Sequence, residues 1–462
     1  MKHIPLKFVF CLLLIEGFIT ISLEILSIRQ LLPFVGNSVI VTSLIIGVFL
    51  LFLSFGYYIG GNCNKNHLEK LQLNFSIAAC LAGVGLSYAF CQSFFRFSEI
   101  FFGSSRLSSL LMYLLFILAP VVLLLGQTIP ITTNFFKKSD SVNKISSQTL
   151  FLSTMGSFLG AVLTSLVLLN FFGVAETIFF NVLLLLFLSL TISFLIRKNR
   201  TIQLFLFFIV GGYLFHLNVN YQNNLFLLTN NYANYQVYED NKNNIHSSYL
   251  LVNNASMSKI DENNKGFEYV EYIKNLAFQQ LKLTNKKFLI IGAGGFSFSQ
   301  ENTFNNTFTY LDIDPSIKEV SEKYFLHSPI KGKFIGIDAR VYFNQQTTRF
   351  DFILSDPYTK KNVPSALLTK EYFTRLKQHL TNNGYVVFNI IADPFLRDAY
   401  SKRVDNTLTS VFRNCTKHPM NYESLTNIIY VCLKTSNEND LQIYTDNKNM
   451  SSRDQFSAIA KS

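Results

Sequence analysis

Long apolar segments fill the first half of this 462-residue chain and give way to a polar second half. Seven of them are long enough, or nearly so, to cross the roughly 30 Å hydrocarbon core of a bilayer, which takes about 20 helical residues. These segments are Phe8–Ile28, Val39–Ile59, Leu71–Phe90, Leu107–Ile129, Leu150–Leu169, Thr177–Ile196 and Ile202–Val219. The pattern predicts an α-helical membrane bundle of about seven spans, integral to a bacterial plasma membrane, with the lipid bilayer as its partner.

The distribution of charge supports this interpretation. Residues 1–219 hold 13 Lys and Arg against 6 Asp and Glu, whereas the remainder holds 27 against 23. The net charge of +11 therefore comes mainly from loops between apolar segments, where basic residues set the orientation of a membrane protein. We predict no nucleic-acid partner. Ten of these 13 residues would share the side of the N-terminus, which favours a cytoplasmic N-terminus.

The side of the membrane occupied by the second half stays open. Seven spans would place everything after Val219 outside the cytoplasm, and an even number would place it inside. Ile202–Val219 is the shortest segment, so this one span decides the answer.

A glycine turn and an acidic residue carry the strongest functional signal of the second half. The apolar stretch Phe288–Ile291 runs into Gly292, Gly294 and Gly295, and a second apolar stretch delivers Asp312, 20 residues after Gly292. Glycines allow the backbone to approach a nucleotide closely, and an acidic side chain about 20 residues later can accept hydrogen bonds from ribose hydroxyls. The combination predicts a nucleotide site.

Alternating strand and helix patterns continue from residue 286 to about residue 434. They predict an α/β Rossmann-like domain of the class I methyltransferase type, with a mostly parallel sheet whose ligand site lies at the carboxyl ends of the strands. Asp312, Asp338 and Asp356 follow three strands at that edge. Each could instead cap the helix that follows it, but three together favour a site.

The motif series in this domain resembles a known family. The relevant stretches are GAGGFS, LDIDP, IDAR, FDFILSDPYT, NVPSALLTKEYF and NGYVVFNII. They look like the polyamine aminopropyltransferases, the spermidine synthase family, and more closely like the branch in which hydrophobic spans precede the synthase domain. Family enzymes are often dimers, so the resemblance also raises the possibility of a homodimer.

The resemblance implies how a donor would bind. Decarboxylated S-adenosylmethionine would be the co-substrate, with no bound cofactor and no metal. Asp312 would hold its ribose and Asp338 would contact its adenine. Gly292, Gly294 and Gly295 would pass beside the sulfonium end.

The resemblance also implies an acceptor site for putrescine or a related amine. Asp356 would position and deprotonate the attacking amine, as the catalytic residue. Gln236, Tyr269, Glu271 and Tyr358 would contact the acceptor or help close the site.

The chain departs from the family pattern at three places. The glycine loop of the synthases carries an acidic residue that binds the aminopropyl end of the donor, and here that place falls at Gly295–Phe296. Met257 lies close to the place of an expected glutamine. Lys360–Lys361 stand where the amine loop usually has a second acidic residue.

Two other functions remain open from the sequence. The domain could be a methyltransferase that uses S-adenosylmethionine itself, because the two chemistries share this sheet. It could also be a non-catalytic module of a membrane protein that binds a nucleotide or a polyamine.

The sequence further predicts four segments and one possible disulfide. The segments are the spans (1–219), a connector with a small β/α element (220–285), the nucleotide-binding domain (286–434) and a polar tail (435–462). Cys415 and Cys432 flank an expected terminal hairpin, so they could form a disulfide if this half is exported.

Overall fold

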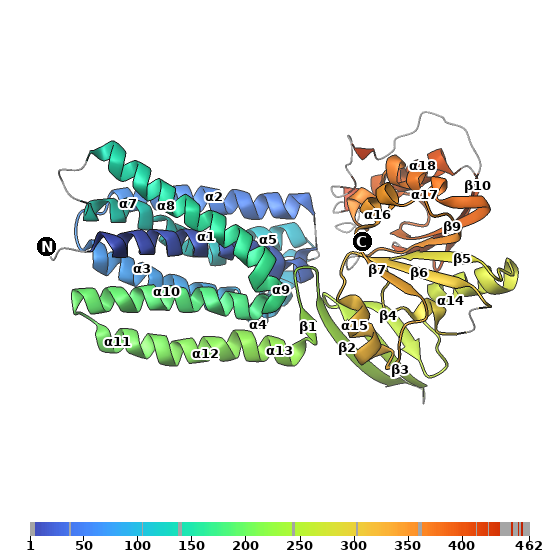
Figure 1. Cartoon of the computed structure of the whole chain (residues 1–462), viewed down its shortest axis with the longest axis horizontal. Coiled ribbons are helices and arrows are strands. Elements are labelled where there is room, and N and C mark those ends of the chain that lie inside the picture. The colour runs from blue at the N-terminus through green and yellow to red at the C-terminus, as the bar shows by residue number, and fades with distance from the viewer. Residues whose placement is uncertain are drawn as a thin grey trace. The chain divides into compact units, whose positions relative to one another are not determined.

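The computed structural model divides the chain into two compact units, Met1–Asn231 and Tyr232–Ser462. Figure 1 follows their course. The described residues are 5–36, 38–103, 105–136, 141–242, 245–301, 304–358, 363–412, 414–423, 425–434, 445–446, 451 and 454–455.

The first unit is helical in its described part, apart from the two-residue strand β1 (Leu228–Thr229). Its helices are α1 (Leu6–Val35), α2 (Val39–Gly61), α3 (His67–Gly85), α4 (Tyr88–Phe102), α5 (Arg106–Tyr113), α6 (Ala119–Gly126), α7 (Thr128–Thr132), α8 (Val142–Leu163), α9 (Leu169–Phe171), α10 (Val174–Ile196), α11 (Arg200–Phe205), α12 (Gly211–Phe215) and α13 (Tyr221–Leu225). Several of these labels divide one longer helical stretch at a π-helical turn or at a single turn residue, so α5–α7, α8–α9 and α11–α13 each belong to one stretch.

Within the described residues, six helical stretches are long and apolar enough to cross a membrane, or seven if α3 and α4 form one span. These two helices meet at a bend of 66°. The span predicted at Leu71–Phe90 therefore falls on a bent pair of helices. The reason is local, because the Ser87 side chain accepts a hydrogen bond from the Phe90 N–H and starts a new helix at that point.

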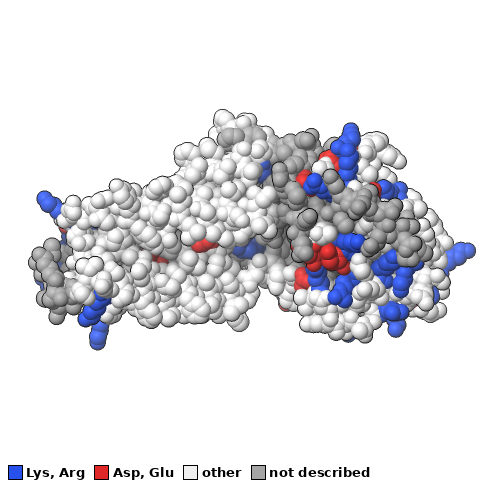
Figure 2. All heavy atoms as spheres, turned by 90° about the horizontal axis from the view of Figure 1, so that it is seen from above, with Lys and Arg blue, Asp and Glu red and all other residues white. Residues whose placement is uncertain are grey.

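The outer surface of the first unit is strongly apolar. Phe116, Phe151 and Phe208 each expose more than 60% of their surface. Figure 2 shows one face of this unit with very few charged atoms, while Lys, Arg, Asp and Glu gather on the second unit. Apolar exposure on this scale marks a surface that contacts lipid or protein rather than water.

The second unit begins with an antiparallel meander and a helix. The strands are β2 (Asn234–Lys242), β3 (Ile245–Val252) and β4 (Ala255–Asp261), with β3 in the middle. Helix α14 (Glu268–Asn275) follows and continues in a π-helical turn to Gln280.

A seven-stranded sheet forms the centre of the second unit, in the order β10-β11-β9-β8-β5-β6-β7. Its strands are β5 (Lys287–Ile291), β6 (Thr307–Asp312), β7 (Lys333–Gly336), β8 (Phe350–Ser355), β9 (Leu380–Ala392), β10 (Asn414–Pro419) and β11 (Thr426–Leu433). The strands β5 to β9 pair in parallel, and β10 and β11 add antiparallel to one edge. The predicted α/β fold with a mostly parallel sheet is confirmed.

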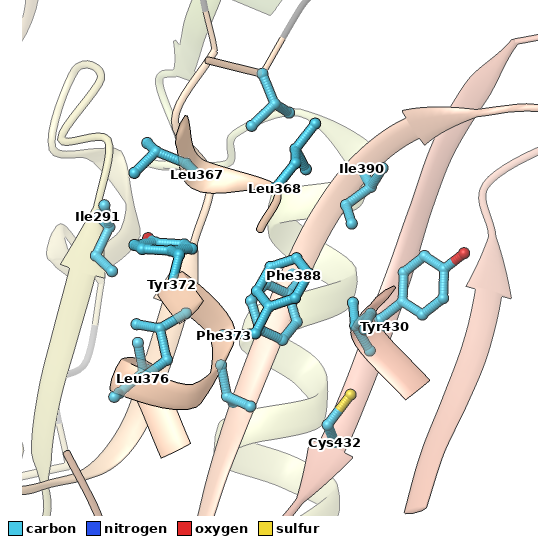
Figure 3. Packing of buried hydrophobic residues seen from close by; sticks show 14 of the residues in the cluster. Ile291, Leu367, Leu368, Tyr372, Phe373, Leu376, Phe388, Ile390, Tyr430 and Cys432 are labelled. Carbon is cyan, nitrogen blue, oxygen red and sulfur yellow. The ribbon is translucent and has the colours of Figure 1, made fainter. Parts of the chain in front are cut away.

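The helices that complete the domain are α15 (Ile317–Val320), α16 (Ala339–Gln345), α17 (Lys370–Gln378) and α18 (Ala399–Val411). Side chains of β5 alternate between two apolar layers, as the strand period requires. Leu289 joins the cluster formed with α16, α17 and α18, while Phe288 contacts Phe278 after α14, with ring centroids 5.8 Å apart. Figure 3 shows Phe373 of α17 against Phe388 of β9, at a centroid distance of 5.1 Å.

A disulfide joins Cys415 of β10 to Cys432 of β11. The two residues lie directly opposite each other in the antiparallel register. The other four cysteines are free and belong to the first unit.

Candidate functional site

The turn after β5 brings the ends of three strands together. Gly292 has a φ of +85° and donates its N–H to the Leu311 carbonyl of β6 at 2.9 Å. The Asp356 N–H, just after β8, donates to the Ile291 carbonyl at 2.8 Å. A Cβ atom at position 292 would lie 2.3 Å from the Asp356 carbonyl oxygen, so only glycine fits this approach.

Asp312 is bound to the same turn. Its Oδ2 accepts a hydrogen bond from the Ala293 N–H at 3.1 Å, and its Oδ1 accepts one from the Asp314 N–H at 3.0 Å. Burial raises the pKa of the Asp312 carboxyl group to about 6, against the lowering effect of these backbone donors. The structure thus places Asp312 beside the glycine turn.

Asp338 lies at the same edge of the sheet, where the Ile337 N–H donates to the Asp312 carbonyl at 2.7 Å. The Asp338 side chain caps α16, because its Oδ1 accepts hydrogen bonds from the N–H groups of Arg340 and Val341 at 2.8 and 3.1 Å. The capping role considered from the sequence is therefore real for this residue, and it fixes where the carboxyl group lies.

Asp356 is partly buried and held at both oxygens. Tyr269 of α14 donates its hydroxyl to Oδ2 at 3.0 Å, and Asn389 of β9 donates its Nδ2 to Oδ1 at 2.8 Å. Burial raises the pKa of the Asp356 carboxyl group to about 7, although both hydrogen bonds act to lower it. A carboxyl group with such a pKa can accept and release a proton near neutral pH.

The Tyr358 hydroxyl forms hydrogen bonds with the backbone of β9 on both sides of Asn389's neighbour Ile390. Its hydroxyl donates to the Asn389 carbonyl at 2.9 Å and accepts from the Ile391 N–H at 2.5 Å. Burial is the main reason why the pKa of this hydroxyl is raised. Tyr358 therefore fastens the segment after β8 onto β9.

The contacts of Glu271 lie on its own helix and the loop before it. Glu271 accepts the Gly266 N–H at 2.7 Å and forms an ion pair of 2.9 Å with Lys274, whose side chain is 4% exposed. Gln236 lies on β2 opposite Leu251. The neighbouring Tyr235 donates its hydroxyl to Asp314 at 2.7 Å and so ties the meander to the turn that follows β6.

The departures from the family pattern have a structural basis at the glycine turn. A Cβ atom at Gly295 would lie 2.2 Å from the Phe325 ring, so Phe325 occupies the space that a side chain there would need. Phe296 is fully buried and contacts Tyr310 and Phe334.

The structure describes the departure at Met257 but not the one at Lys360–Lys361. Ser258, next to Met257, accepts the Gly295 N–H at 2.7 Å through its hydroxyl oxygen. Lys360 and Lys361 lie outside the described residues. In the parts of the chain that are described, no group of three or more His, Cys, Asp or Glu residues is arranged to hold a metal ion.

The sequence analysis did not single out Asn389 or Ser258, which the structure places beside Asp356 and the glycine turn. One signal was available for Asn389, because a single amide in the apolar strand VVFNII is buried only with a hydrogen-bond partner. Ser258 carried no comparable signal, since it meets its partner Gly295 only in the folded chain.

This domain is similar to known proteins. The sequence profile of the family described as "Spermine/spermidine synthase domain" matches residues 266–445. The polyamine aminopropyltransferase of Vibrio vulnificus is 31% identical over 134 residues, which is 28% of this chain and 44% of that protein. The probable polyamine aminopropyl transferase of Bifidobacterium longum is 26% identical over 106 residues, or 23% of this chain and 24% of that protein.

This chain thus spans less than half the length of the curated relatives it matches. Among solved structures, a probable spermidine synthase from Corynebacterium glutamicum aligns with 18% identity and a TM-score of 0.37, covering 49% of this chain and 82% of that one. The family resemblance predicted from the sequence is confirmed by the profile match.

Proposed function

We propose that this chain, whose residues 266–445 match the spermine/spermidine synthase domain, is a membrane-anchored aminopropyltransferase. It transfers the aminopropyl group of decarboxylated S-adenosylmethionine to putrescine or a related amine. The observation that carries the proposal is Asp356, held by Tyr269 and Asn389 at the carboxyl end of β8, with a pKa of about 7.

The reaction needs a base and a fixed geometry. The acceptor arrives as an ammonium ion, and the ionised Asp356 removes one proton from it. The nitrogen lone pair then forms a bond to the methylene carbon beside the sulfonium, and the carbon–sulfur bond breaks with its electron pair remaining on sulfur. Methylthioadenosine leaves as a neutral thioether, and Asp356 releases the proton to solvent. Alignment of the two reactants supplies much of the acceleration.

The donor would lie along the carboxyl ends of β5, β6 and β7. Asp312 would bind the ribose hydroxyls, Asp338 would face the adenine, and the turn at Gly292 and Gly294 would allow the sulfonium end to approach the backbone. The short distance between this turn and Asp356 supports the assignment, because donor and base must meet across it.

Anchoring in a membrane is supported by the six or seven apolar helices and by the exposed aromatic side chains of the first unit. Extraction of cell membranes with alkaline carbonate tests it. We expect the protein to stay in the membrane pellet, and its release into the supernatant would contradict the anchoring.

The activity is tested with full-length protein purified in detergent. It is incubated with decarboxylated S-adenosylmethionine and putrescine, and spermidine and methylthioadenosine are measured by mass spectrometry. Asp356→Asn should abolish both products while donor binding survives. Asp351→Asn, at the other end of β8, is the matched control and should retain turnover.

One observation favours a second candidate function. Phe325 fills the space beside Gly295, where the synthases carry the acidic residue for the aminopropyl end. A methyltransferase using S-adenosylmethionine itself would not need that carboxylate. Retention of the carboxylated and the decarboxylated donor by the same protein separates the two candidates, and stronger retention of the carboxylated donor with methyl transfer would favour the second. If folded protein forms neither the aminopropyl product nor the methylated product, a non-catalytic binding role is the remaining candidate.

A further inference from the structure

The Asn389 side chain has one satisfied end and one unsatisfied end. It is 2% exposed, and its Nδ2 donates to Asp356. Its Oδ1 is buried, and no described residue donates a hydrogen bond to it. A buried acceptor without a donor costs about 1–3 kcal/mol, so native proteins rarely keep one without a reason.

The orientation of this amide is fixed by its partners. An ionised carboxylate only accepts hydrogen bonds, so the donor end of the amide must face Asp356. The other oxygen of Asp356 already accepts the Tyr269 hydroxyl. Flipping the amide would place two acceptors against each other, which keeps Oδ1 as the unsatisfied end.

This unsatisfied oxygen lies beside the reacting carboxylate. The two ends of one amide share a carbon atom, so Oδ1 is a near neighbour of the Asp356 oxygen that Nδ2 contacts. Asn389 stands on β9 next to the end of β8, where Phe388 is in register with Ser355. For a ligand N–H bound to Asp356, Oδ1 of Asn389 is thus an adjacent acceptor.

We propose that Asn389 binds the reacting nitrogen of the acceptor amine through Oδ1 while its Nδ2 holds Asp356 in place. This inference rests on the proposed function, and it deepens that function by naming how the amine is oriented. The ammonium ion donates one N–H to Asp356 and another to Asn389. Once Asp356 has taken its proton, the remaining bond to Oδ1 directs the nitrogen lone pair away from the amide and toward the donor.

The chemistry of the pair also defines the acceptor. One carboxylate and one neutral amide match a primary amine at the reacting end, since it carries enough N–H groups for both. A tertiary amine retains only one N–H when charged and cannot satisfy both groups. Besides Asn389, the described titratable group that contacts Asp356 is the Tyr269 hydroxyl. The Tyr358 hydroxyl lies near Asp356 and near the Tyr400 hydroxyl.

The test compares Asn389→Leu with Asn389→Asp in full-length protein. Asn389→Leu removes both ends, so the KM for the amine should rise about tenfold or more, as expected for a lost hydrogen bond to a charged group. The KM for the donor should not change. Asn389→Asp keeps an acceptor oxygen for the amine but loses the donor to Asp356, so it should keep more of its amine affinity.

The pH profile supplies a readout that a packing role would not move. Loss of the Nδ2 donor removes a hydrogen bond that favours the ionised Asp356, so the rising limb of kcat/KM should shift to higher pH in both variants. Asn306→Leu is the matched control, because this buried asparagine donates to Leu283, accepts from Lys286 and precedes β6 at the opposite end of the sheet. It should lower stability without changing the amine KM.

Amine binding without turnover separates the two proposals. Stabilisation of the protein by putrescine against heat is measured in the presence of methylthioadenosine. If native protein binds the amine but makes no product, and Asn389→Leu loses that binding, the proposed function fails and the role of Asn389 stands. An unchanged amine KM or unchanged binding in Asn389→Leu, together with an unchanged pH profile, would overturn the inference.

Discussion

Replacing Asp356 with Asn should remove activity and at the same time make the protein more stable. The pKa of this carboxyl group rises from its ordinary value of 3.8 to about 7 in the folded protein, mainly through burial. The folded state therefore binds a proton more tightly than the unfolded chain does. Stability falls as pH rises from about 4 to about 7, because the buried group must then be ionised.

The magnitude follows from the two pKa values. Their difference corresponds to roughly 4 kcal/mol at about 1.36 kcal/mol per tenfold change. Since Asp356 is only partly buried, we expect about half of this, or about 2 kcal/mol above neutral pH. Asparagine has the same shape and carries no charge. Its oxygen can accept from Asn389, and its amide can donate to the Tyr269 hydroxyl.

Pulse proteolysis across a urea gradient measures this effect in full-length protein. At about pH 8 the Asp356→Asn variant should unfold at a higher urea concentration than the native protein, and the difference should shrink toward pH 5. Asp351→Asn is the control, because Asp351 accepts hydrogen bonds from Lys287 and Thr381 and its replacement should not stabilise the domain. Equal urea midpoints for native protein and Asp356→Asn at pH 8 would falsify the reasoning.

Four further predictions follow from the same geometry. The kcat/KM of native protein should rise with pH through about 7, since Asp356 accepts a proton only when ionised, and a flat profile between pH 6 and 8 would argue against it as the base. Tyr269→Phe should shift that rise to higher pH while leaving donor binding intact, as shown by kinetics at several pH values. Gly292→Ala should lower the free energy of unfolding by about 2–4 kcal/mol, because of backbone strain at positive φ and the clash with the Asp356 carbonyl. Gly266→Ala is the control and should cost less, because a Cβ there meets side-chain atoms at 3.3 Å or more. Gly295→Asp should destabilise the protein, because the new side chain clashes with Phe325. Adding Phe325→Ala should relieve the clash and tighten binding of decarboxylated S-adenosylmethionine. Calorimetry that finds no gain in donor affinity for the double variant would contradict the steric explanation.

The sheet could be predicted because its strands carry local signals. Short apolar runs such as FLII and FDFILS, bounded by Gly, Asp and Pro, indicate buried parallel strands, and acidic residues at their ends indicate a shared edge. Asp312 and Asp356 were placed at this edge in this way, and the structure has both of them there. Helix starts depend on single capping residues, since α17 begins after the Thr369 cap and α18 begins after the Asp398 cap.

Partners that lie far apart in sequence could not be predicted. Tyr269 and Asn389 meet at Asp356 only because α14 and β9 converge there, and no local pattern encodes that meeting. Glu271 lies in the same helix as Tyr269, and the buried Lys274 one turn later forms an ion pair with its carboxylate. The bend between α3 and α4 was missed because an apolar run does not reveal where a serine cap interrupts it.

If the chain crosses a bilayer as proposed, the disulfide between Cys415 and Cys432 bears on how many times it crosses. Thiol pairs stay reduced in the glutathione-buffered cytoplasm and become oxidised outside it. With a cytoplasmic N-terminus, an oxidised pair requires an odd number of crossings, so that α3 and α4 count as one span, and a reduced pair requires an even number. An oxidised pair would also separate the domain from every metabolite made and kept inside the cell. The redox state of these two sulfur atoms therefore reports the parity of the membrane crossings and the pool from which the enzyme must draw its donor.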